Sequence, residues 1–304
     1  MTHDVVIVGG SFAGQAAALQ LARARRRVLL IDAKRPRNRF ARHSHGFLGQ
    51  DGEAPGAIIA AAGRQLATYP TVEVREGTVV DASAVAGGFR VVLADGTRET
   101  GRRLILAIGL RDTLPDLPGA EERWGVSLLH CPYCHGYELD RQPVGVLAGG
   151  PMAFHQAMLV PDWGPTTLFT QGAFEPTPEQ RSALAARGVT IEPSPVVALL
   201  GDAPALAGVR LADGRTIAVA GLFLAPRTAP ASDLAERLGC AFEEGPTGPL
   251  IRADGRGRTS VPGVFAAGDA ASPMANATLA AAAGVLAAGS AHHSLIFGIE
   301  PERA

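Results

Sequence analysis

The chain has 304 residues, of which 47% are hydrophobic and 19% are charged, and these proportions are typical of a folded globular protein rather than a disordered or fibrous one. Its length exceeds the usual size of a single core, so two domains are expected. The formal net charge is -1 and no long charged tract is present, which argues against nucleic acid and anionic membranes as partners.

The N-terminal residues run straight into the apolar segment 4–9, without a charged leader or a small-residue cleavage site, so no signal peptide is indicated. The Ala- and Gly-rich stretch from Thr278 to Ala291 is expected to be too short to span a bilayer. We therefore expect a cytoplasmic protein without a membrane association. In a reducing compartment three cysteines do not build a disulfide framework, so a close pair indicates catalysis or metal binding.

Apolar runs alternate with helical segments from the first residues onward. Residues 4–9 are strand-like, residues 14–23 are Ala- and Leu-rich and helical, and residues 27–32 form a second strand that ends in an acid. This βαβ pattern, with strands that are apolar throughout, predicts a parallel sheet covered on both faces. A helix at 53–67 and strands at 72–75, 78–81, 89–93 and 103–108 are expected to follow.

A Pro- and Gly-rich segment at 113–119 indicates a linker, and a second βαβ pattern follows it. Its expected elements are a strand at 144–148, a helix at 152–160, and strands at 166–170, 189–192, 209–211 and 221–225. Another break at 244–249 precedes a strand at 264–267 and a final Ala-rich helix. The pattern predicts two doubly wound α/β units in tandem.

The segment between the first strand and the first helix has the pattern of a dinucleotide-binding fingerprint. It consists of Gly9, Gly10, Ser11, Phe12, Ala13 and Gly14. Gly9 permits the tight turn, Gly14 allows close packing of helix on strand, and the helix N-terminus offers backbone N–H groups to a pyrophosphate. Asp32 ends the next strand, where an acid accepts from a ribose hydroxyl. Ser11 departs from the usual middle glycine. A plain glycine turn is the alternative, but strand, turn, helix and acid together favour dinucleotide binding.

The segment 264–270 is an apolar strand that ends in Gly268 and Asp269 before an Ala-rich helix. It resembles the second flavin signature of the disulfide reductases that hold two dinucleotides, in which the aspartate binds near the ribityl chain. A surface turn is the alternative interpretation. Together with the first glycine segment, this resemblance predicts FAD as the cofactor.

Cys131 and Cys134 are spaced Cys-x-x-Cys, with Pro132 between them. On a turn or helix start this spacing brings two sulfurs within disulfide reach, and a helix N-terminus favours the thiolate. Half of a zinc site is the competing interpretation, since His130 and His135 flank the pair. A structural zinc needs four ligands and no second cysteine pair exists, because Cys240 is remote in the sequence. Beside a flavin signature, the redox interpretation is favoured.

These motifs together resemble the thioredoxin-reductase-like flavoproteins, the low-molecular-weight branch of the pyridine nucleotide–disulfide oxidoreductases. The similarity extends over the chain and includes the strand that ends at Gly109. It implies two Rossmann-like domains of three-layer β/β/α type, with an FAD domain (1–114 and 245–304) interrupted by a central domain (115–244). It also implies a homodimer, with Cys134 nearest the flavin and Cys131 attacking the substrate.

The central domain departs from a thioredoxin reductase where NADPH should bind. Ala148 replaces the first glycine of the second loop, and Pro151 and Met152 stand where small polar residues are usual. The family places a His-Arg-Arg cluster after the next strand to bind the 2′-phosphate, whereas this chain has no cation there before Arg181. Because a phosphate without charge-assisted partners binds poorly, NADPH is not expected to be the direct reductant.

His135 follows the second cysteine, where thioredoxin reductases have an acid, and its neutral ring can accept a proton near pH 7. Residues 131–138 are similar to the dithiol oxidases of gliotoxin, holomycin and romidepsin biosynthesis. These enzymes form a disulfide in a small molecule and pass electrons through FAD to O2. The resemblance therefore favours a dithiol oxidase that acts on a small-molecule or peptide dithiol, with Cys131, Cys134 and His135 as catalytic residues.

Other side chains are expected near the cofactor. His45 is expected to contact the flavin in preference to His43, and Asn38 and Arg39 are expected to line the adenosine or the pyrophosphate, although each fits an ordinary loop residue equally well. Cys240 is expected to be a small buried hydrophobe.

Two other functions stay open at this point. A thioredoxin or disulfide reductase would take electrons from NAD(P)H or ferredoxin. A flavin-bearing redox sensor would switch conformation without turnover. No metal cofactor is expected in any of the three cases.

Overall fold

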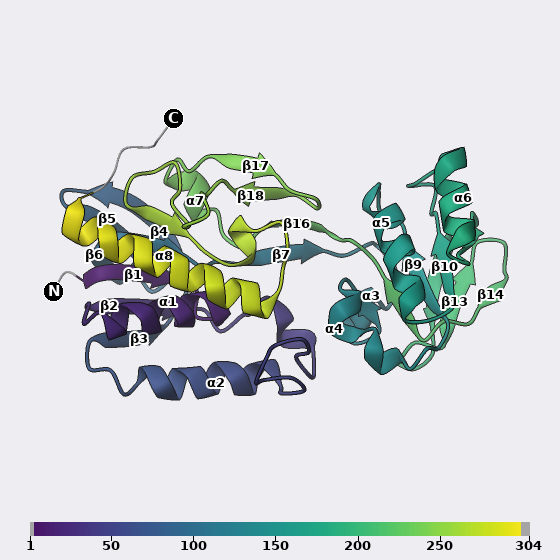
Figure 1. Ribbon diagram of the computed structural model, residues 1–304, viewed down its shortest axis with the longest axis horizontal. Helices are drawn as coiled ribbons and strands as arrows, with labels where there is room; N and C mark the ends of the chain where they lie inside the picture. Colours follow the sequence, from purple (N-terminus) through teal and green to yellow (C-terminus); the bar gives the residue numbers. More distant parts are fainter. Residues whose placement is uncertain (1–2, 299–304) are drawn as a thin grey trace. The chain divides into compact units, whose positions relative to one another are not determined.

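The computed structural model describes residues 3–298, and the chain separates into two compact units (Figure 1). Unit 1 comprises Met1–Arg39, Pro55–Arg111 and Thr228–Ala304, and unit 2 comprises Phe40–Ala54 and Asp112–Arg227. The chain passes between them within β7 (Leu110–Thr113) and β16 (Arg227–Pro230), and these two strands pair with each other. These ranges differ from the expected domain boundaries at residues 40–54, 112–114 and 228–244.

Unit 1 is built on a seven-stranded sheet in the order β3-β2-β1-β6-β5-β4, with β19 paired to β6. The strands β3, β2, β1, β6 and β19 run parallel, whereas β4, β5 and the first half of β6 form an antiparallel meander. The strand bounds are β1 (His3–Val8), β2 (Val28–Asp32), β3 (Val72–Glu76), β4 (Val79–Val85), β5 (Gly88–Leu93), β6 (Arg98–Leu106) and β19 (Val264–Ala266).

Alternating residues of the buried strands face two different cores in unit 1. Val5 and Ile7 of β1 pack with the alanine-rich helices α1 (Phe12–Arg23) and α8 (Ala277–Phe297). Val6 and Val8 face the other way, toward β4 and β5. The period-two alternation of a strand thus produces three layers: helices, parallel sheet and β meander.

Residues 228–244 belong to unit 1 because their apolar side chains complete its second core. Leu234, Ala235 and Cys240 pack with Leu104 and Val264 of the sheet. The elements concerned are the short helix α7 (Leu234–Arg237) and the hairpin of β17 (Phe242–Glu244) and β18 (Pro249–Ile251). The break at 244–249 is therefore the turn of a hairpin within unit 1.

Unit 2 repeats the three-layer plan with a smaller sheet. Five parallel strands lie in the order β11-β10-β9-β15-β8. Helices α5 and α6 pack on one face, and a three-stranded antiparallel sheet, β12-β13-β14, packs on the other. The predicted fold class, two three-layer α/β units, is confirmed.

The bounds in unit 2 are α3 (Ala120–Arg123), β8 (Leu128–Leu129), α4 (Pro132–His135), η2 (Tyr137–Leu139), β9 (Val144–Leu147), α5 (Met152–Leu159), η3 (Val160–Asp162), β10 (Thr166–Phe169), α6 (Pro178–Ala186), β11 (Thr190–Glu192), β12 (Val196–Leu200), β13 (Gly208–Leu211), β14 (Thr216–Ile217) and β15 (Gly221–Phe223). Unit 1 also contains α2 (Pro55–Leu66) and η4 (Asp269–Ala271), and η1 (Arg37–Phe40) lies where the chain first leaves it.

Helix α8 is longer than the apolar stretch that the sequence indicated. Its 21 residues are long and apolar enough to cross a membrane by length and composition, so the expectation of a segment too short to span is wrong. The C-terminal turns, through His292 and Phe297, continue the helix beyond Ala291. One such helix is weak evidence for a membrane, because core helices pass the same test, and α8 packs along α1 in unit 1 (Figure 1).

Candidate functional site

The glycine segment after β1 is packed so tightly that side chains are excluded. A Cβ on Gly9 would lie 2.7 Å from the carbonyl carbon of Ala107, and one on Gly14 would lie 2.9 Å from that of Gly9. Real Cβ atoms essentially never come within 3.0 Å of such neighbours. Gly9 also has a φ of +105°, which favours glycine. The turn and the close helix packing expected of these two glycines are both present.

Asp32 contacts this turn directly. The backbone N–H of Gly10 donates to its Oδ1 at 3.3 Å, and the backbone N–H of Lys34 donates to the same oxygen at 3.1 Å. A Cβ on Gly10 would lie 2.5 Å from the Cβ of Asp32. Because Gly10 has no side chain, a buried carboxylate can face the start of α1, which is the arrangement that binds a ribose hydroxyl.

Ser11 caps α1 in an extended conformation, and its side chain makes no capping hydrogen bond. The side chain of the serine that stands for the usual middle glycine therefore does not cap this 12-residue helix, whose N-terminus is the kind of position that binds a phosphate. Phe12 and Ala13 begin this helix.

Gln15 is a residue of this site that the sequence motifs did not reveal. Its Nε2 donates to the carbonyl oxygen of Gly10 at 3.0 Å, and the side chain is buried. Among the described residues its Oε1 has no hydrogen-bond partner. A buried acceptor beside a dinucleotide turn fits a hydroxyl or amide donor of a cofactor.

The segment after β19 meets the start of α1. A Cβ on Gly268, whose φ is +78°, would lie 3.0 Å from the Cβ of Ala13. Asp269 follows, and its Oδ2 accepts from the Nη1 of Arg37 at 3.2 Å. The two glycine motifs, 254 residues apart in the sequence between Gly14 and Gly268, therefore converge at one end of the parallel sheet.

The loop after β2 brings Arg37 into contact with the second glycine motif. Arg37, rather than Asn38 or Arg39, reaches Asp269, and the Nη1 of Arg39 donates to the carbonyl oxygen of Pro36 at 3.0 Å. Gly109 has a φ of +66°, and its carbonyl oxygen accepts from Ala231 N–H at 3.0 Å. The contacts of Asn38, Arg39 and Gly109 with a cofactor stay predictions.

Cys131 and Cys134 form a disulfide in unit 2, with their Cα atoms 5.3 Å apart. Cys131 precedes the one-turn helix α4, and Pro132 occupies its first position. A Cβ on Gly136 would lie 2.6 Å from the indole of Trp163, whose ring also meets Tyr133 edge-on at 5.2 Å between centroids. The disulfide loop thus packs against the side chain of Trp163.

Gln156 of α5 holds the chain just before the disulfide. Its Nε2 donates to the carbonyl oxygen of His130 at 2.9 Å, while its buried Oε1 has no partner among residues 3–298. This contact joins residues 26 positions apart, which is why spacing within the motif did not indicate it.

His135 ends α4 and is half-buried. Burial lowers the pKa of His135, the nearby Glu138 carboxylate acts to raise it, and His45 acts to lower it. A half-buried imidazole that favours its neutral form can serve as a proton acceptor next to the disulfide.

His45 lies in unit 2, within Phe40–Ala54. Its Nε2 is 3.4 Å from Glu138 Oε1, and its Nδ1 is 3.7 Å from Asp51 Oδ1. His43 contacts the carbonyl oxygen of Gly52 at 2.9 Å through its Nδ1. The expected contact of His45 with the flavin stays a prediction, and the partners observed for it belong to the disulfide unit.

The second glycine loop, in unit 2, has none of the tight packing of the first. A Cβ on Gly150 would meet nothing within 4 Å, and one on Gly149 only an oxygen at 3.8 Å. Pro151 caps α5, so the start of this eight-residue helix has one backbone donor fewer. The glycines here are not required by close contacts, in contrast to Gly9 and Gly14.

The polar side chains that follow β10 already have partners within unit 2. The Oε1 of Gln171 accepts from Val196 N–H at 2.7 Å, and its Nε2 donates to the Val196 carbonyl oxygen at 3.4 Å. Arg181 is paired with Glu175. At the end of β11, Glu192 binds both terminal nitrogens of Arg215, which lowers the pKa of this carboxyl.

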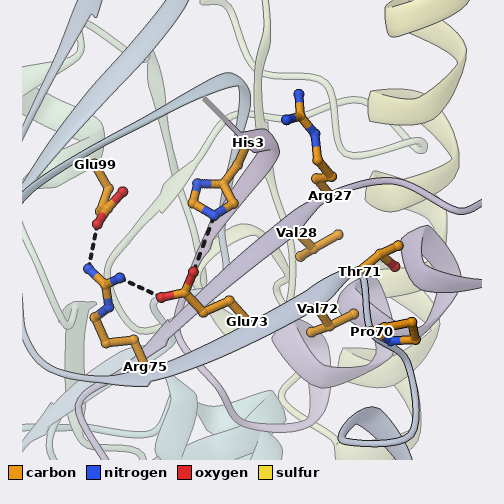
Figure 2. Close-up of a pocket in the computed structure, with 9 residues that line it drawn as sticks. All are labelled: His3, Arg27, Val28, Pro70, Thr71, Val72, Glu73, Arg75 and Glu99. Atoms are coloured by element: carbon orange, nitrogen blue, oxygen red, sulfur yellow. Dashed lines mark hydrogen bonds and ion pairs between the residues drawn. The ribbon is translucent and has the colours of Figure 1, made fainter. Parts of the chain in front are cut away.

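A pocket of about 380 Å³ lies at the opposite end of the sheet of unit 1, where β1, β2 and β3 begin. Figure 2 shows Glu73 between His3 and Arg75, with Arg75 also paired to Glu99. The hydrogen bond from Arg75 lowers the pKa of Glu73. None of the predicted site residues lines this pocket.

Cys240 is buried in the second core of unit 1, where burial raises the pKa of its thiol. Its Sγ is 3.7 Å from Thr259 Oγ1. The thiol thus has the surroundings of a packing residue.

Comparisons with known proteins agree with this geometry. The family model of the pyridine nucleotide-disulphide oxidoreductases matches residues 3–284. Thioredoxin reductase tcpT of Claviceps purpurea is 31% identical and covers 99% of this chain and 96% of its own length. Thioredoxin reductase sirT of Leptosphaeria maculans is 32% identical over 93% of this chain and 91% of its own.

Two solved structures are also similar over nearly the whole chain. The oxidoreductase from Agrobacterium tumefaciens has a TM-score of 0.94 and 52% identity, covering 99% of this chain and 100% of its own. HlmI has a TM-score of 0.91 and 41% identity, covering 98% and 93%. Together with the paired glycine motifs and the Cys131–Cys134 disulfide, these similarities show that the chain belongs to the pyridine nucleotide-disulphide oxidoreductase family, as an FAD-dependent enzyme of the thioredoxin-reductase-like type.

Proposed function

We propose that this enzyme is a dithiol oxidase, which forms a disulfide in a small-molecule or peptide dithiol and passes the two electrons through Cys131–Cys134 and FAD to O2. The observation that supports it most is the contrast between the two glycine loops. The loop of unit 1 is packed for a dinucleotide, whereas that of unit 2 has loosely packed glycines and a proline at the helix start.

The absence of a cation at the expected position supports the same direction of electron flow. Gln171 is bound to the backbone of Val196, and Arg181 is paired with Glu175. Each charge-assisted hydrogen bond to a phosphate is worth ~1.5–3 kcal/mol. Losing two of them weakens NADPH binding by ~10²-fold or more. Electrons are therefore proposed to enter from the thiol substrate.

In the proposed first half-reaction, a substrate thiolate attacks Sγ of Cys131. A bond forms between the substrate sulfur and Cys131, the Cys131–Cys134 bond breaks, and Cys134 leaves as a thiolate. The second substrate thiol then attacks the substrate sulfur of the mixed disulfide and releases Cys131. The substrate is oxidised by two electrons, and its two protons end on the cysteine pair.

His135 is proposed to handle these protons. Because burial lowers its pKa, the imidazole favours the neutral form that can accept a proton from the incoming thiol. The same ring can return the proton to the leaving sulfur. Gly136 and Gln156 hold the loop in which this exchange takes place.

The residues of unit 1 fit FAD. Gly9, Gly10 and the start of α1 would receive its pyrophosphate, Asp32 a ribose hydroxyl, and Asp269 the ribityl region. Bound by these residues, FAD would supply a two-electron acceptor for the reduced cysteine pair, with O2 as the proposed final acceptor and hydrogen peroxide as its product.

A second function, that of a thioredoxin or disulfide reductase, is favoured by the names of the relatives tcpT and sirT. Electrons would then arrive from a pyridine nucleotide or from a protein such as ferredoxin. By its resemblance to the family, the enzyme is also proposed to be a homodimer.

Oxygen uptake and peroxide formation, followed after dithiothreitol is mixed with the flavin-loaded enzyme in air, test the oxidase. We expect uptake well above that of a Cys134→Ser variant. Equal rates would remove the oxidase proposal. Anaerobic addition of NADPH or NADH is the second arm, and rapid bleaching of the flavin would favour the reductase.

A further inference from the structure

His45 is held by an ordered loop within the disulfide unit. Ser44 N–H donates to the Glu53 carbonyl oxygen at 2.8 Å and Gly52 N–H donates to the Ser44 carbonyl oxygen at 2.9 Å, so the loop closes on itself. Inside it, Gly46 N–H donates to Asp51 Oδ1 at 2.7 Å. The imidazole is therefore presented by a defined backbone rather than by an open strand.

The same segment is packed against the chain that leads to the disulfide. A Cβ on Gly125 would lie 2.8 Å from the Cβ of Phe40, so the two backbones approach closely at this point. The contact of His45 Nε2 with Glu138 Oε1 at 3.4 Å adds a second one, three residues beyond His135. Two separate contacts thus join residues 40–54 to the part of unit 2 that carries the disulfide.

The side chain of His45 lies between two carboxylates. It is 23% exposed, whereas those of Asp51 and Glu138 are 67% and 45% exposed. The ring of His43 is 6.3 Å away between centroids. Asp51, Glu138 and His43 thus face His45. The titratable groups that act on the pKa of His135 are Glu138 and His45.

We infer that His45 is a positioning residue of the disulfide site. It acts on His135 indirectly, because it binds the Glu138 carboxylate and so changes the electrostatic potential at the His135 ring. The inference rests on the proposed function in that it treats His135 as the proton acceptor. A free Glu138 carboxylate favours the protonated form of His135, and a paired one does so less. Opposite effects on His135 are therefore expected from removing His45 and from removing the Glu138 charge.

The test measures the titration of His135 directly in the oxidised, flavin-loaded enzyme. The Cε1–H resonance of His135 is followed against pH by NMR with ¹³C-labelled histidine and assigned with a His135→Asn variant. We expect the midpoint to rise in His45→Gln and to fall in Glu138→Gln, each by roughly 0.3–1 pH unit, as one unit charge produces over several ångströms near a surface.

His43→Gln is the matched control, because it removes a histidine of the same loop that contacts the Gly52 carbonyl oxygen and the His45 ring but is not among the groups that act on His135. We expect it to leave the His135 midpoint unmoved. If His45→Gln and Glu138→Gln shift the midpoint in the same direction, or if neither shifts it, the inference is overturned. Glu138→Gln alone still decides the sign if His45→Gln does not fold.

The anaerobic reaction with dithiothreitol separates the two proposals. Stopped-flow reduction of the flavin should show its acid limb moving to higher pH in His45→Gln and to lower pH in Glu138→Gln. A wild-type enzyme whose flavin is not reduced by the dithiol would refute the proposed function while the NMR titration still decided the role of His45.

Discussion

Gly284 lies where α8 crosses the start of α1, and replacing it with alanine tests how closely the core and the cofactor site are coupled. A Cβ on Gly284 would lie 2.9 Å from the carbonyl carbon of Ala13 and 3.1 Å from its Cα, and closer still to its oxygen. These atoms belong to the backbone of α1 just beyond the glycine turn, so they cannot move aside independently. We expect α8 to shift or the turn to distort.

The magnitude follows from two opposing effects. Glycine to alanine inside a helix stabilises it by ~1 kcal/mol, and overpacking costs ~1–3 kcal/mol. Gly63 in α2 is the matched control, because a Cβ there meets nothing within 4 Å. Gly63→Ala has the helix stabilisation without the overpacking cost, so Gly284→Ala should be less stable than Gly63→Ala by roughly 1–3 kcal/mol. That difference corresponds to about 2–10 °C in Tm.

Thermal unfolding of both variants, with and without added FAD, measures the difference, and flavin fluorescence measures release of the cofactor. We expect Gly284→Ala to release FAD at a lower temperature than Gly63→Ala, because the displaced residue begins the helix that faces the pyrophosphate. If Gly284→Ala melts at or above the temperature of Gly63→Ala, the close approach of α8 and α1 does not constrain this site.

Three further predictions concern single residues. Gln15→Leu removes the donor to the Gly10 carbonyl and the buried Oε1, so the Kd for FAD should rise about tenfold, measured by fluorescence titration of the apoprotein; an unchanged Kd would contradict the role given to Gln15. Gly9→Ala should be purified without flavin while Gly149→Ala keeps it, as absorbance at 450 nm would show; equal flavin content would count against the contrast between the loops. The pKa of His135 is lowered by burial, so below pH ~6.5 the unfolded state binds more protons and the free energy of unfolding decreases as the pH is lowered. His135→Gln should flatten this part of the urea-unfolding profile, and an identical profile would argue against an imidazole that favours its neutral form in the folded enzyme.

The glycine motifs and the cysteine pair were predictable because each is a local pattern. Gly9, Gly14 and Asp32 follow from one βαβ unit, in which strand, turn and helix dictate the spacing. The Cys-x-x-Cys spacing likewise brings two sulfurs within bonding reach over a single turn. The similarity of 264–270 to a flavin signature indicated the cofactor for the same reason.

The partners of these motifs were not predictable, since they come from distant parts of the chain. Arg37 binds Asp269 across 232 positions, whereas Arg39, which has the same side chain, donates to the Pro36 carbonyl oxygen, so residue type alone did not select between these two. Gln156 is a buried amide on an apolar helix, and only its approach to His130 gives it a role.

The amino-acid sequence alone determined that the chain has two α/β units, one complete dinucleotide turn and a close pair of cysteines, because these depend on contacts within about 25 residues. The tertiary structure decided that residues 228–244 complete the core of unit 1 and that residues 40–54 belong with the disulfide. Hydrophobic packing is not directional, so the sequence does not specify which core an apolar or loop segment will join. For that reason the contact of His45 with Glu138 became apparent only in the folded chain.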